Sequence, residues 1–462
     1  MTRIFSDYAY GEGPVSGCYW AETVPDGPTD FPAVSGTMSV DVVVIGAGFT
    51  GLSAALHLAQ DGAEVMALDA EYPGWGASGR NGGFCCLGGA KASSADIARR
   101  FGEVALQGWR RAEQDAVTLV RELLTTQGIE ADTHSNGETI LAHNVRNARA
   151  LQGDVARVKS EYGIDATWHA PADLTRLGMS GPFHGGLTIP VGFGLNPRKY
   201  LSGLVRAARN AGARIHGDSR AIAIEQQGRG ITIRTELATI RARRLVIATN
   251  GYSSEELPPW MAGRYLPAQS NVLVTRPLTQ IELEAAGWTS RQMVYDTRNL
   301  LHYFRLMPDN RFLFGMRGGL LASPVAEAGI NRRARVHFEA MFPAWKDVET
   351  PNSWSGMVCF SSNRVPYCGP IPDLPGAFAG FAFHGNGVAM GSYTGALLAD
   401  LVQGKPTRLP HPAVMQASAP RFPLGRYRSD ERQPSWPVPT TTLAGGAERK
   451  TGLPVWRAAP PA

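Results

Sequence analysis

The sequence feature that most constrains the fold of this chain is a glycine-rich turn between two apolar runs. Val40 to Ile45 is almost wholly apolar and β-branched, which favours a strand buried on both faces. Gly46, Gly48 and Gly51 follow it in the pattern G-x-G-x-x-G. The first glycine permits a tight turn, the second lets the backbone approach a pyrophosphate, and the third lets the next helix pack closely on the strand.

A predicted helix and a second strand complete this unit. The helix spans about residues 50–60, and its N-terminus directs free N–H groups toward phosphates. The second apolar run, Glu64 to Leu68, ends at Asp69. This acid follows Gly46 by about twenty positions, where an acid that binds a ribose hydroxyl is expected. Strand, turn, helix, strand and acid in this order predict a dinucleotide-binding site.

Two further glycine-rich segments indicate close contact between the backbone and a ligand. The segment from Tyr72 to Phe84, Y-P-G-W-G-A-S-G-R-N-G-G-F, is too rich in glycine for regular structure. It is predicted to bring N–H groups close to a flat or anionic group. The segment F-A-F-H-G-N-G-V-A-M-G-S predicts a strand that runs into Gly385 and Gly387, with a helix soon after. This second turn is predicted to face a phosphate or a ring.

Length, charge and cysteine spacing exclude several functional classes. The 462 residues suffice for two or three domains of about 150 residues each. No N-terminal signal core and no run of roughly 18 apolar residues is present, so we expect a cytoplasmic protein without a membrane span. The net charge of +5 is concentrated from Arg421 onward, so no nucleic-acid partner is expected. The five cysteines fit no C-x-x-C spacing, and no metal site is predicted.

Periodicity predicts the elements that surround these turns. Ser93 to Gln127 is predicted to form one helix with Ser94 as its N-cap. Tyr19 and Trp20 are predicted to anchor an irregular N-terminal arm. Leu300 to Arg305 is predicted to form a strand that pairs with the next strand across the turn Met-Pro-Asp-Asn. Within it, Tyr303 and Arg305 alternate with a phenylalanine and so share one face.

Three separated blocks resemble the D-amino-acid oxidase superfamily of FAD-dependent amine and amino-acid oxidoreductases. They are D-V-V-V-I-G-A-G-F-T-G-L-S-A-A-L, W-G-A-S-G-R-N-G-G-F and F-A-F-H-G-N-G-V-A-M-G-S. A-T-N-G-Y from Ala248 to Tyr252 and W-S-G from Trp354 to Gly356 support the resemblance, which spans residues 40 to about 403. The Arg-Asn-Gly-Gly of the middle block and H-Y-F-R from His302 to Arg305 are most similar to the γ-glutamylputrescine oxidoreductase branch.

The resemblance implies an α/β fold with two interleaved domains. A Rossmann-like FAD-binding domain is expected to alternate along the chain with an α+β substrate domain built on a mostly antiparallel sheet. The expected parts are an N-terminal arm at 1–38, an FAD-binding domain at 39–90, 196–255 and 355–403, a substrate domain at 91–195 and 256–354, and an irregular, proline-rich tail at 404–462.

The resemblance also implies FAD bound in an extended form. Gly46, Gly48 and Gly51 would bind the pyrophosphate, and Asp69 would bind the adenosine ribose. The other implied contacts are Ser78, Gly79, Arg80, Asn81 and Gly82 at the diphosphate and flavin edge, Ala221, Ala248 and Gly251 along the nucleotide, and Gly385, Asn386, Gly387, Val388 and Ala389 at the isoalloxazine ring. The positive helix end there would stabilise the negative charge of a reduced flavin.

Two departures from the family pattern bear on the substrate and on the cofactor linkage. Amino-acid oxidases of the family tend to have Arg two residues after the glycine of the W-x-G motif, where it grips the substrate carboxylate. Val358 occupies that position here. Some relatives attach FAD covalently through a Cys shortly after this Trp. Cys359 lies about three positions beyond that point in a gapless alignment, so non-covalent FAD is expected.

The resemblance implies an enzyme that oxidises the C–N bond of a primary or secondary amine to an imine by hydride transfer to flavin N5. The expected substrate is a small γ-glutamyl amine or another N-substituted amine, and the expected electron acceptor is O2. Candidate catalytic residues are His302, Tyr303, Arg305 and His384. Because Val358 cannot pair with a carboxylate, an amine without one on its reacting carbon is favoured, with any acidic group meeting Arg305.

Three other functions remain open. An amino-acid oxidase or dehydrogenase of the same superfamily would act on a D-amino acid, glycine or sarcosine. A nicotinamide dehydrogenase would explain Gly46 to Asp69 but not the two later glycine-rich segments. A flavin-fold subunit kept for assembly or ligand binding would have lost its chemistry. Bound yellow flavin would exclude the nicotinamide enzyme, and bleaching of that flavin by an amine would exclude the subunit.

Overall fold

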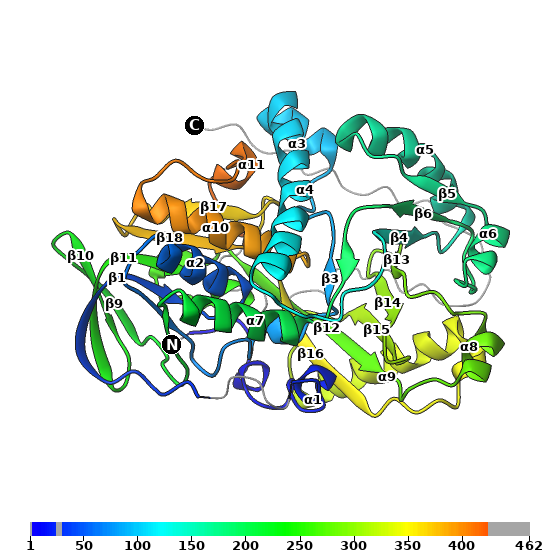
Figure 1. Cartoon of the computed structure of the whole chain (residues 1–462), viewed down its shortest axis with the longest axis horizontal. Helices are drawn as coiled ribbons and strands as arrows, with labels where there is room; N and C mark the ends of the chain where they lie inside the picture. The colour runs from blue at the N-terminus through cyan, green and yellow to red at the C-terminus, as the bar shows by residue number, and fades with distance from the viewer. Residues whose placement is uncertain (1, 25–29, 424–462) are drawn as a thin grey trace. The chain divides into compact units, whose positions relative to one another are not determined.

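Two large β-sheets organise the chain (Figure 1). The computed structural model describes residues 2–24 and 30–423, and these belong to one compact unit. Of the predicted tail at 404–462, the part after residue 423 lies outside the described residues.

The first sheet is the predicted Rossmann-like sheet. Its strand order is β17-β18-β11-β1-β2-β8, and a hairpin of β9 and β10 extends it beside β11. β1 pairs in parallel with β11 and β2, and β2 pairs in parallel with β8. The strands are β1 (Gly36–Ile45), β2 (Val65–Leu68), β8 (Arg214–His216), β9 (Ala223–Gln227), β10 (Gly230–Arg234), β11 (Ala238–Ile247), β17 (Tyr367–Pro370) and β18 (Ala377–Phe381).

The second sheet is mostly antiparallel, as predicted. Its strand order is β16-β12-β15-β14-β13-β4-β6-β5, with β13 and β4 paired in parallel. The strands are β4 (Glu138–Leu141), β5 (Thr167–His169), β6 (Gly186–Ile189), β12 (Leu266–Val274), β13 (Met293–Asp296), β14 (His302–Leu306), β15 (Phe312–Arg317) and β16 (Asn352–Phe360). A separate small pair consists of β3 (Phe84–Cys85) and β7 (Phe193–Gly194).

Helices α2, α4, α7 and α10 lie together over the first sheet (Figure 1). Leu52 of α2, Trp109 of α4 and Leu397 of α10 are fully buried in their shared core. α4 therefore packs with the nucleotide-binding unit, which the predicted domain boundary at residue 91 does not anticipate. The described α-helices are α1 (Tyr19–Glu22), α2 (Phe49–Gln60), α3 (Ser94–Phe101), α4 (Glu103–Thr126), α5 (Val145–Tyr162), α6 (Pro171–Arg176), α7 (Pro197–Asn210), α8 (Gln280–Ala286), α9 (Pro324–Met341), α10 (Ala389–Gln403) and α11 (Ala413–Gln416).

The predicted single helix at 93–127 is two helices, α3 and α4. The Ser93 side chain accepts a hydrogen bond from the Asp96 N–H at 3.1 Å, so Ser93 rather than Ser94 is the N-cap. Gly102 separates the helices with a φ of +89°, which glycine adopts without steric cost. The single-helix prediction was wrong because apolar residues on both sides of the break face the same core.

The N-terminal arm is anchored by the two aromatic residues that the sequence predicts. Trp20 is buried, and its indole N–H donates to the Asn81 carbonyl oxygen at 2.8 Å. The Tyr19 hydroxyl donates to Asp309. The arm is therefore fixed both to the glycine-rich loop and to the turn between β14 and β15. The first strand begins at Gly36, slightly before the predicted end of the arm.

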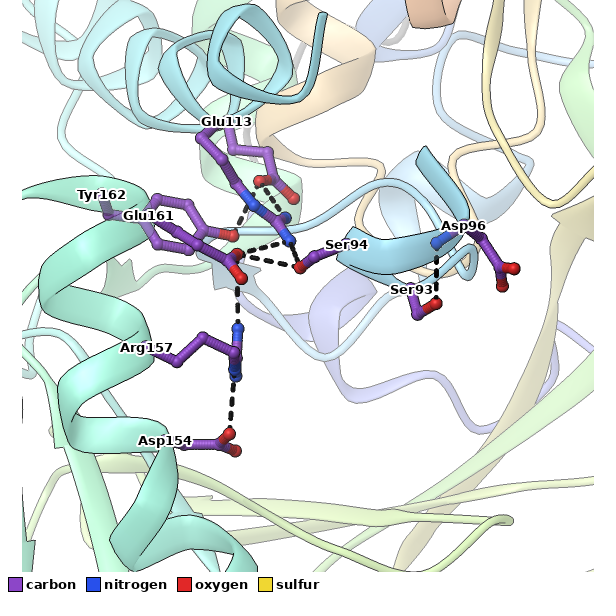
Figure 2. A network of polar contacts seen from close by, with 9 residues as sticks. Ser93, Ser94, Asp96, Glu113, Asp154, Arg157, Glu161 and Tyr162 are labelled. Carbon is purple, nitrogen blue, oxygen red and sulfur yellow. Dashed lines mark hydrogen bonds and ion pairs between the residues drawn. The ribbon is translucent and has the colours of Figure 1, made fainter. Parts of the chain in front are cut away.

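A buried ion network joins α4 to α5 (Figure 2). Arg110 donates to Glu113 at 2.8 Å, and its other terminal nitrogen lies 2.8 Å from Glu161. The Tyr162 hydroxyl also donates to Glu113 at 2.8 Å. Because Glu113 is almost fully buried, these two partners balance a carboxylate that water does not reach.

The two faces of the second sheet have different partners. On one face, Phe304 and Phe312 pack against Phe338 of α9 in an aromatic core. On the other face, the Tyr303 ring lies against Gly82 of the glycine-rich loop. The candidate functional site lies on this second face, between the second sheet and the glycine-rich turns.

Candidate functional site

The first glycine-rich turn joins β1 to α2 as predicted. Gly46 has a φ of +99°, and a Cβ there would lie 2.9 Å from the Ala248 carbonyl oxygen. A Cβ on Gly48 would lie 2.7 Å from Ser78 Oγ, and one on Gly51 would overlap the Gly46 carbonyl oxygen. The turn is therefore packed against the end of β11, against the glycine-rich loop and against itself. Gly46 and Gly51 must be glycine because an added Cβ would meet backbone atoms, whereas at Gly48 it would meet the Ser78 side chain.

Asp69 follows β2 and lies directly beside this turn. Its Oδ2 accepts a hydrogen bond from the Ala47 N–H at 2.9 Å, and its Oδ1 accepts one from the Glu71 N–H at 3.1 Å. Burial raises the pKa of Asp69 to about 6, although these hydrogen bonds act in the opposite direction. Asp69 therefore holds the turn in place, and its contact with a ribose stays a prediction.

The glycine-rich loop from Tyr72 to Phe84 is held by its own polar side chains. The Arg80 guanidinium donates to the Ser355 carbonyl oxygen at 3.1 Å and to the Tyr252 hydroxyl at 2.8 Å. The Asn81 side chain makes hydrogen bonds within the loop. Arg80 and Asn81 both line the cavity described below, but their polar groups mainly fix the loop.

The second glycine-rich turn connects β18 to α10. Gly385 has a φ of +103°, a left-handed value suited to glycine. The Asn386 side chain donates to the Leu87 carbonyl oxygen, and its Oδ1 accepts from the Cys86 thiol at 3.4 Å. The second turn therefore contacts the chain just after the glycine-rich loop. The prediction that both glycine-rich segments surround one ligand requires them to lie this close together.

A cavity of about 470 Å³ runs between these turns and the second sheet. The predicted cofactor residues that line it are Gly46, Gly48, Asp69, Ser78, Arg80, Asn81, Gly82, Ala221, Ala248, Gly385, Asn386, Gly387 and Val388. Within the described part of the chain, four others are not lining residues: Gly51, Gly79, Gly251 and Ala389. For Gly51 the reason is clear, because it is the close-packing point between helix and turn.

The donors and the shape of this cavity fit FAD. Asp69 and Ala221 line the cavity together with Gly48, at the start of α2, and Gly387, just before α10. Helix N-termini present unpaired N–H groups to anions. Glycines that leave room for hydrogen alone let an extended ligand approach the backbone.

Tyr303 of β14 lies in the cavity, as its strand face predicts. A Cβ on Gly82 would lie 2.7 Å from the Tyr303 ring, so the ring lies directly under the glycine-rich loop. The Tyr303 hydroxyl is hydrogen-bonded to Ser270 Oγ of β12 at 2.9 Å. Burial raises the pKa of Tyr303, so the phenol stays protonated at neutral pH.

His384 also lines the cavity, but both of its ring nitrogens bind protein groups. Nδ1 lies 3.0 Å from the Gly89 carbonyl oxygen and therefore donates to it. Nε2 lies 3.4 Å from the Ser361 N–H and therefore accepts from it. Burial lowers the pKa of His384 to about 4, so the ring is neutral. These contacts favour a structural role for His384 over the predicted catalytic one.

His302 lies on the opposite face of β14 from Tyr303. Its Nδ1 is 2.6 Å from Asp296 Oδ2, and its Nε2 is 2.7 Å from His337 Nδ1 on α9. Only 2% of His302 is exposed, and its neighbours are those of the aromatic core. Strand alternation directs this side chain away from the cavity, which disfavours the predicted catalytic role of His302.

Arg305 shares the face of Tyr303, as predicted, but lies beyond the cavity. Its Nε donates to the Gly82 carbonyl oxygen at 3.1 Å, and its Nη2 donates to the Leu195 carbonyl oxygen at 2.7 Å. Its Nη1 is hydrogen-bonded to His134 Nε2 at 2.8 Å. These hydrogen bonds disfavour the prediction that Arg305 meets an acidic substrate group, because all three guanidinium nitrogens already contact the protein.

We expect the substitution Arg305→Met to lower stability rather than to change substrate preference. It would leave the carbonyl oxygens of Gly82 and Leu195 without their charged donor in a buried region. The free energy of unfolding should fall by about 2–4 kcal/mol. Urea unfolding measures this loss, and Arg305→Lys should lose less because it keeps one donor. An unchanged unfolding midpoint would contradict the structural role.

Several charged side chains that the sequence did not predict also line the cavity, and two of them have a buried polar atom without a partner among the described residues. Arg317, the last residue of β15, lies against Gly385, and its buried Nη1 has no hydrogen-bond partner among the described residues. Glu138, the first residue of β4, is 2% exposed, and its Oε2 lacks a partner in the same part of the chain. Burial lowers the pKa of Arg317 and raises the pKa of Glu138 to about 8.

Strand register is the signal that could have identified Arg317. Tyr303 pairs with Gly315 across the hairpin, and Arg317 follows two residues later on the same strand. Side chains at paired positions, and at every second residue along a strand, share one face. The register of the predicted hairpin therefore places Arg317 beside Tyr303.

The described residues contain no candidate metal site, no membrane-spanning helix and no disulfide. Within residues 2–24 and 30–423, His, Cys and acidic side chains form no cluster that could hold a metal ion. No helix in those ranges is long and apolar enough to cross a membrane. The five cysteines in those ranges are buried and form no disulfide.

Comparison with known sequences confirms the resemblance. The chain matches the family described as "FAD dependent oxidoreductase" over residues 41–401. It is 32% identical to the "Probable oxidoreductase OrdL" of Rhizobium meliloti (strain 1021), over 90% of this chain and 96% of that protein. It is 28% identical to the γ-glutamylputrescine oxidoreductase of Escherichia coli (strain K12), over 82% of this chain and 89% of that protein.

Comparison with solved structures confirms the predicted fold. Glycine oxidase from Geobacillus kaustophilus superimposes with a TM-score of 0.68 and 21% sequence identity. The match covers 83% of this chain and 100% of that chain. At this level of identity the similarity concerns the fold and not the substrate.

Proposed function

The chain belongs to the DAO family of FAD-dependent oxidoreductases, and we propose that it oxidises the C–N bond of a small amine to an imine. The similarity to a γ-glutamylputrescine oxidoreductase supports an amine with a γ-glutamyl group or another N-substituent. FAD, when bound, supplies the two-electron acceptor for this oxidation. Gly46, Gly48 and Asp69 would hold its nucleotide half, and Gly387 would lie beside its ring.

The observation that carries this proposal is the placement of Arg317 and Val358 on one face of the second sheet. Ser270 of β12 pairs with Arg317 on one side and with Gly356 on the other. Val358 follows Gly356 by two residues and therefore lies on the same face, and it lines the cavity. An acidic group of the substrate would pair with Arg317, whereas the apolar Val358 favours an uncharged group beside it.

Tyr303 and Ser270 would orient the amine. Their hydroxyls share one hydrogen bond, so each keeps capacity for a further partner in the cavity. Phe84 and Met357 add apolar surface to the same cavity and limit the access of water to the reacting amine. The chain would thus bind, orient and desolvate the substrate, and the helix end at Gly387 would stabilise negative charge on the ring.

A second candidate function, oxidation of a small amino acid, is favoured by the same guanidinium. The sequence argument against α-amino acids rested on Val358, but Arg317 reaches this cavity from a neighbouring strand. A buried guanidinium with an unused N–H among its described neighbours suits a carboxylate of either substrate class. The distinction therefore depends on the distance between the carboxylate and the reacting carbon.

Anaerobic mixing of the FAD-loaded protein with a substrate panel tests the proposal. A γ-glutamyl amine or another N-substituted amine should bleach the flavin with a higher kcat/KM than glycine, sarcosine or D-alanine. If an amino acid were the best of the panel, the second candidate would replace the first. Failure of every amine and amino acid to bleach bound flavin would overturn both. Rapid return of the yellow colour with air would identify O2 as the proposed acceptor.

We expect FAD to be bound without a covalent bond. Cys359 lines the cavity but is almost fully buried, because it packs in the core of the first sheet with its Cβ near Gly251. Cys86 lines the cavity, but burial raises its pKa well above the usual range, and a protonated thiol is a poor nucleophile. Acid precipitation should therefore release all of the yellow colour into the supernatant. Colour that stays with the pellet would show covalent attachment.

A further inference from the structure

We propose that Glu138 forms a subsite for a second basic group of the substrate, remote from the reacting carbon, so that the preferred substrates are amines with an additional ammonium group. Glu138 lines the cavity with a buried carboxyl oxygen that is unpaired within the described chain. This inference rests on the proposed amine oxidation and specifies the class of amine.

Glu138 and Arg317 are too far apart to pair with each other. They lie on β4 and β15, which β13 and β14 separate. Three strand spacings and the offset along the strands place their Cα atoms about 20 Å apart. Neither side chain can therefore serve as the partner of the other. Tyr303 of β14 lies between them, where a substrate that reaches Glu138 would present its reacting end.

The groups around Glu138 suit a cation. The Cys86 thiol, which is hydrogen-bonded to Glu138, and the Glu113 carboxylate act on Glu138. Tyr162 and Arg157 also act on its neighbour Tyr295, and Arg157 is already paired with Asp154 and Glu161. Burial raises the pKa values of Cys86 and Tyr295, so both stay neutral. Arg110, which pairs with Glu113, is already engaged in the ion network of Figure 2. A ligand ammonium is the partner that this arrangement accommodates.

Protonation of Glu138 should be coupled to ligand binding. Its pKa of about 8 keeps the carboxyl neutral in the free protein at pH 7. An ammonium group favours the ionised carboxylate, so Glu138 gives its proton to water when the ligand binds. At pH 7 one proton is released for each bound cation. The affinity for the cation should rise with pH up to about 8, because the free energy needed to ionise Glu138 falls as the pH approaches its pKa. Above that pH Glu138 is already ionised, so the affinity should level off.

Steady-state kinetics with hexylamine and 1,6-diaminohexane test the subsite, because the two probes differ only in the second amine. The FAD-loaded protein should prefer the diamine by about 30-fold in kcat/KM, the range of a charged hydrogen bond. E138Q should lose this preference and keep its activity toward hexylamine. The preference of the unsubstituted protein should increase between pH 6 and 8, and the preference of E138Q should not.

Two matched variants separate the subsite from general effects. E113Q removes a buried carboxylate that is paired outside the cavity, and it should keep the preference for the diamine. R317M should also keep it, because neither probe carries an acid. Oxidation of both amines with equal kcat/KM would overturn the subsite and leave the proposed function intact. Oxidation of neither probe nor any panel amine would overturn the proposed function itself. If E138Q does not fold, proton release by the unsubstituted protein decides: at pH 7 the diamine should release about one proton more than hexylamine, and equal release by the two probes would overturn the subsite.

Discussion

Gly51→Ala is expected to abolish FAD binding and to lower the free energy of unfolding by about 4 kcal/mol or more. A Cβ at this position would overlap the Gly46 carbonyl oxygen and lie 3.2 Å from Val44 Cγ1. Neither neighbour can move easily, because the Gly46 N–H is hydrogen-bonded to the Leu68 carbonyl oxygen at 2.8 Å and Val44 is fully buried. The start of α2 would therefore have to move away from β1, and the predicted pyrophosphate site would be lost.

Flavin fluorescence titration and urea unfolding measure these two effects. Gly153→Ala is the matched control, since Gly153 lies in α5 with open space where its Cβ would be placed. This control should bind FAD normally and gain up to about 1 kcal/mol of stability, because alanine favours a helix more than glycine does. Normal FAD affinity in the Gly51 variant would show that close packing at this turn is not required.

The nucleotide-binding unit could be predicted from sequence because its determinants are local. The order of strand, turn and helix at Gly46 to Gly51 follows from spacing along the chain, and the same holds for the turn at Gly385. Each glycine is needed for a backbone conformation or a close approach that involves neighbouring residues. The hairpin of β14 and β15 in the second sheet was predicted for a similar reason, since alternation and a turn signal define it.

The catalytic assignments could not be predicted because they depend on which segment covers each strand. Alternation correctly places Tyr303 and Arg305 on one face, but only the packed structure shows that the loop at Gly82 covers Arg305. His302 is similar in type to a catalytic histidine, yet it faces α9. The register of the hairpin places Arg317 on the face of Tyr303, but the sequence does not reveal that β12 and Gly385 lie beside it in the cavity.

Arg317→Met is expected to reduce kcat/KM for acid-bearing amines about 100-fold while changing kcat/KM for a plain amine by less than about threefold. The guanidinium lies in the cavity against Gly385, and its Nη1 is buried without a partner in the described chain. A substrate carboxylate would supply the missing acceptor, and methionine fills similar space without a charge. A γ-glutamyl amine and hexylamine are the paired substrates for this measurement.

Two controls determine whether Arg317 serves the substrate or the cofactor. Arg317→Lys keeps the charge but loses the two-pronged donor, so it should recover only part of the activity toward the acid-bearing amine. The FAD dissociation constant should be the same for the unsubstituted protein and for both variants. If Arg317→Met weakened FAD binding and slowed both substrates equally, the guanidinium would act on the flavin, because its contact with Gly385 places it beside the predicted ring site. Loss of activity toward the acid-bearing amine alone would instead assign Arg317 to the substrate, since only that amine carries the charge it can pair with.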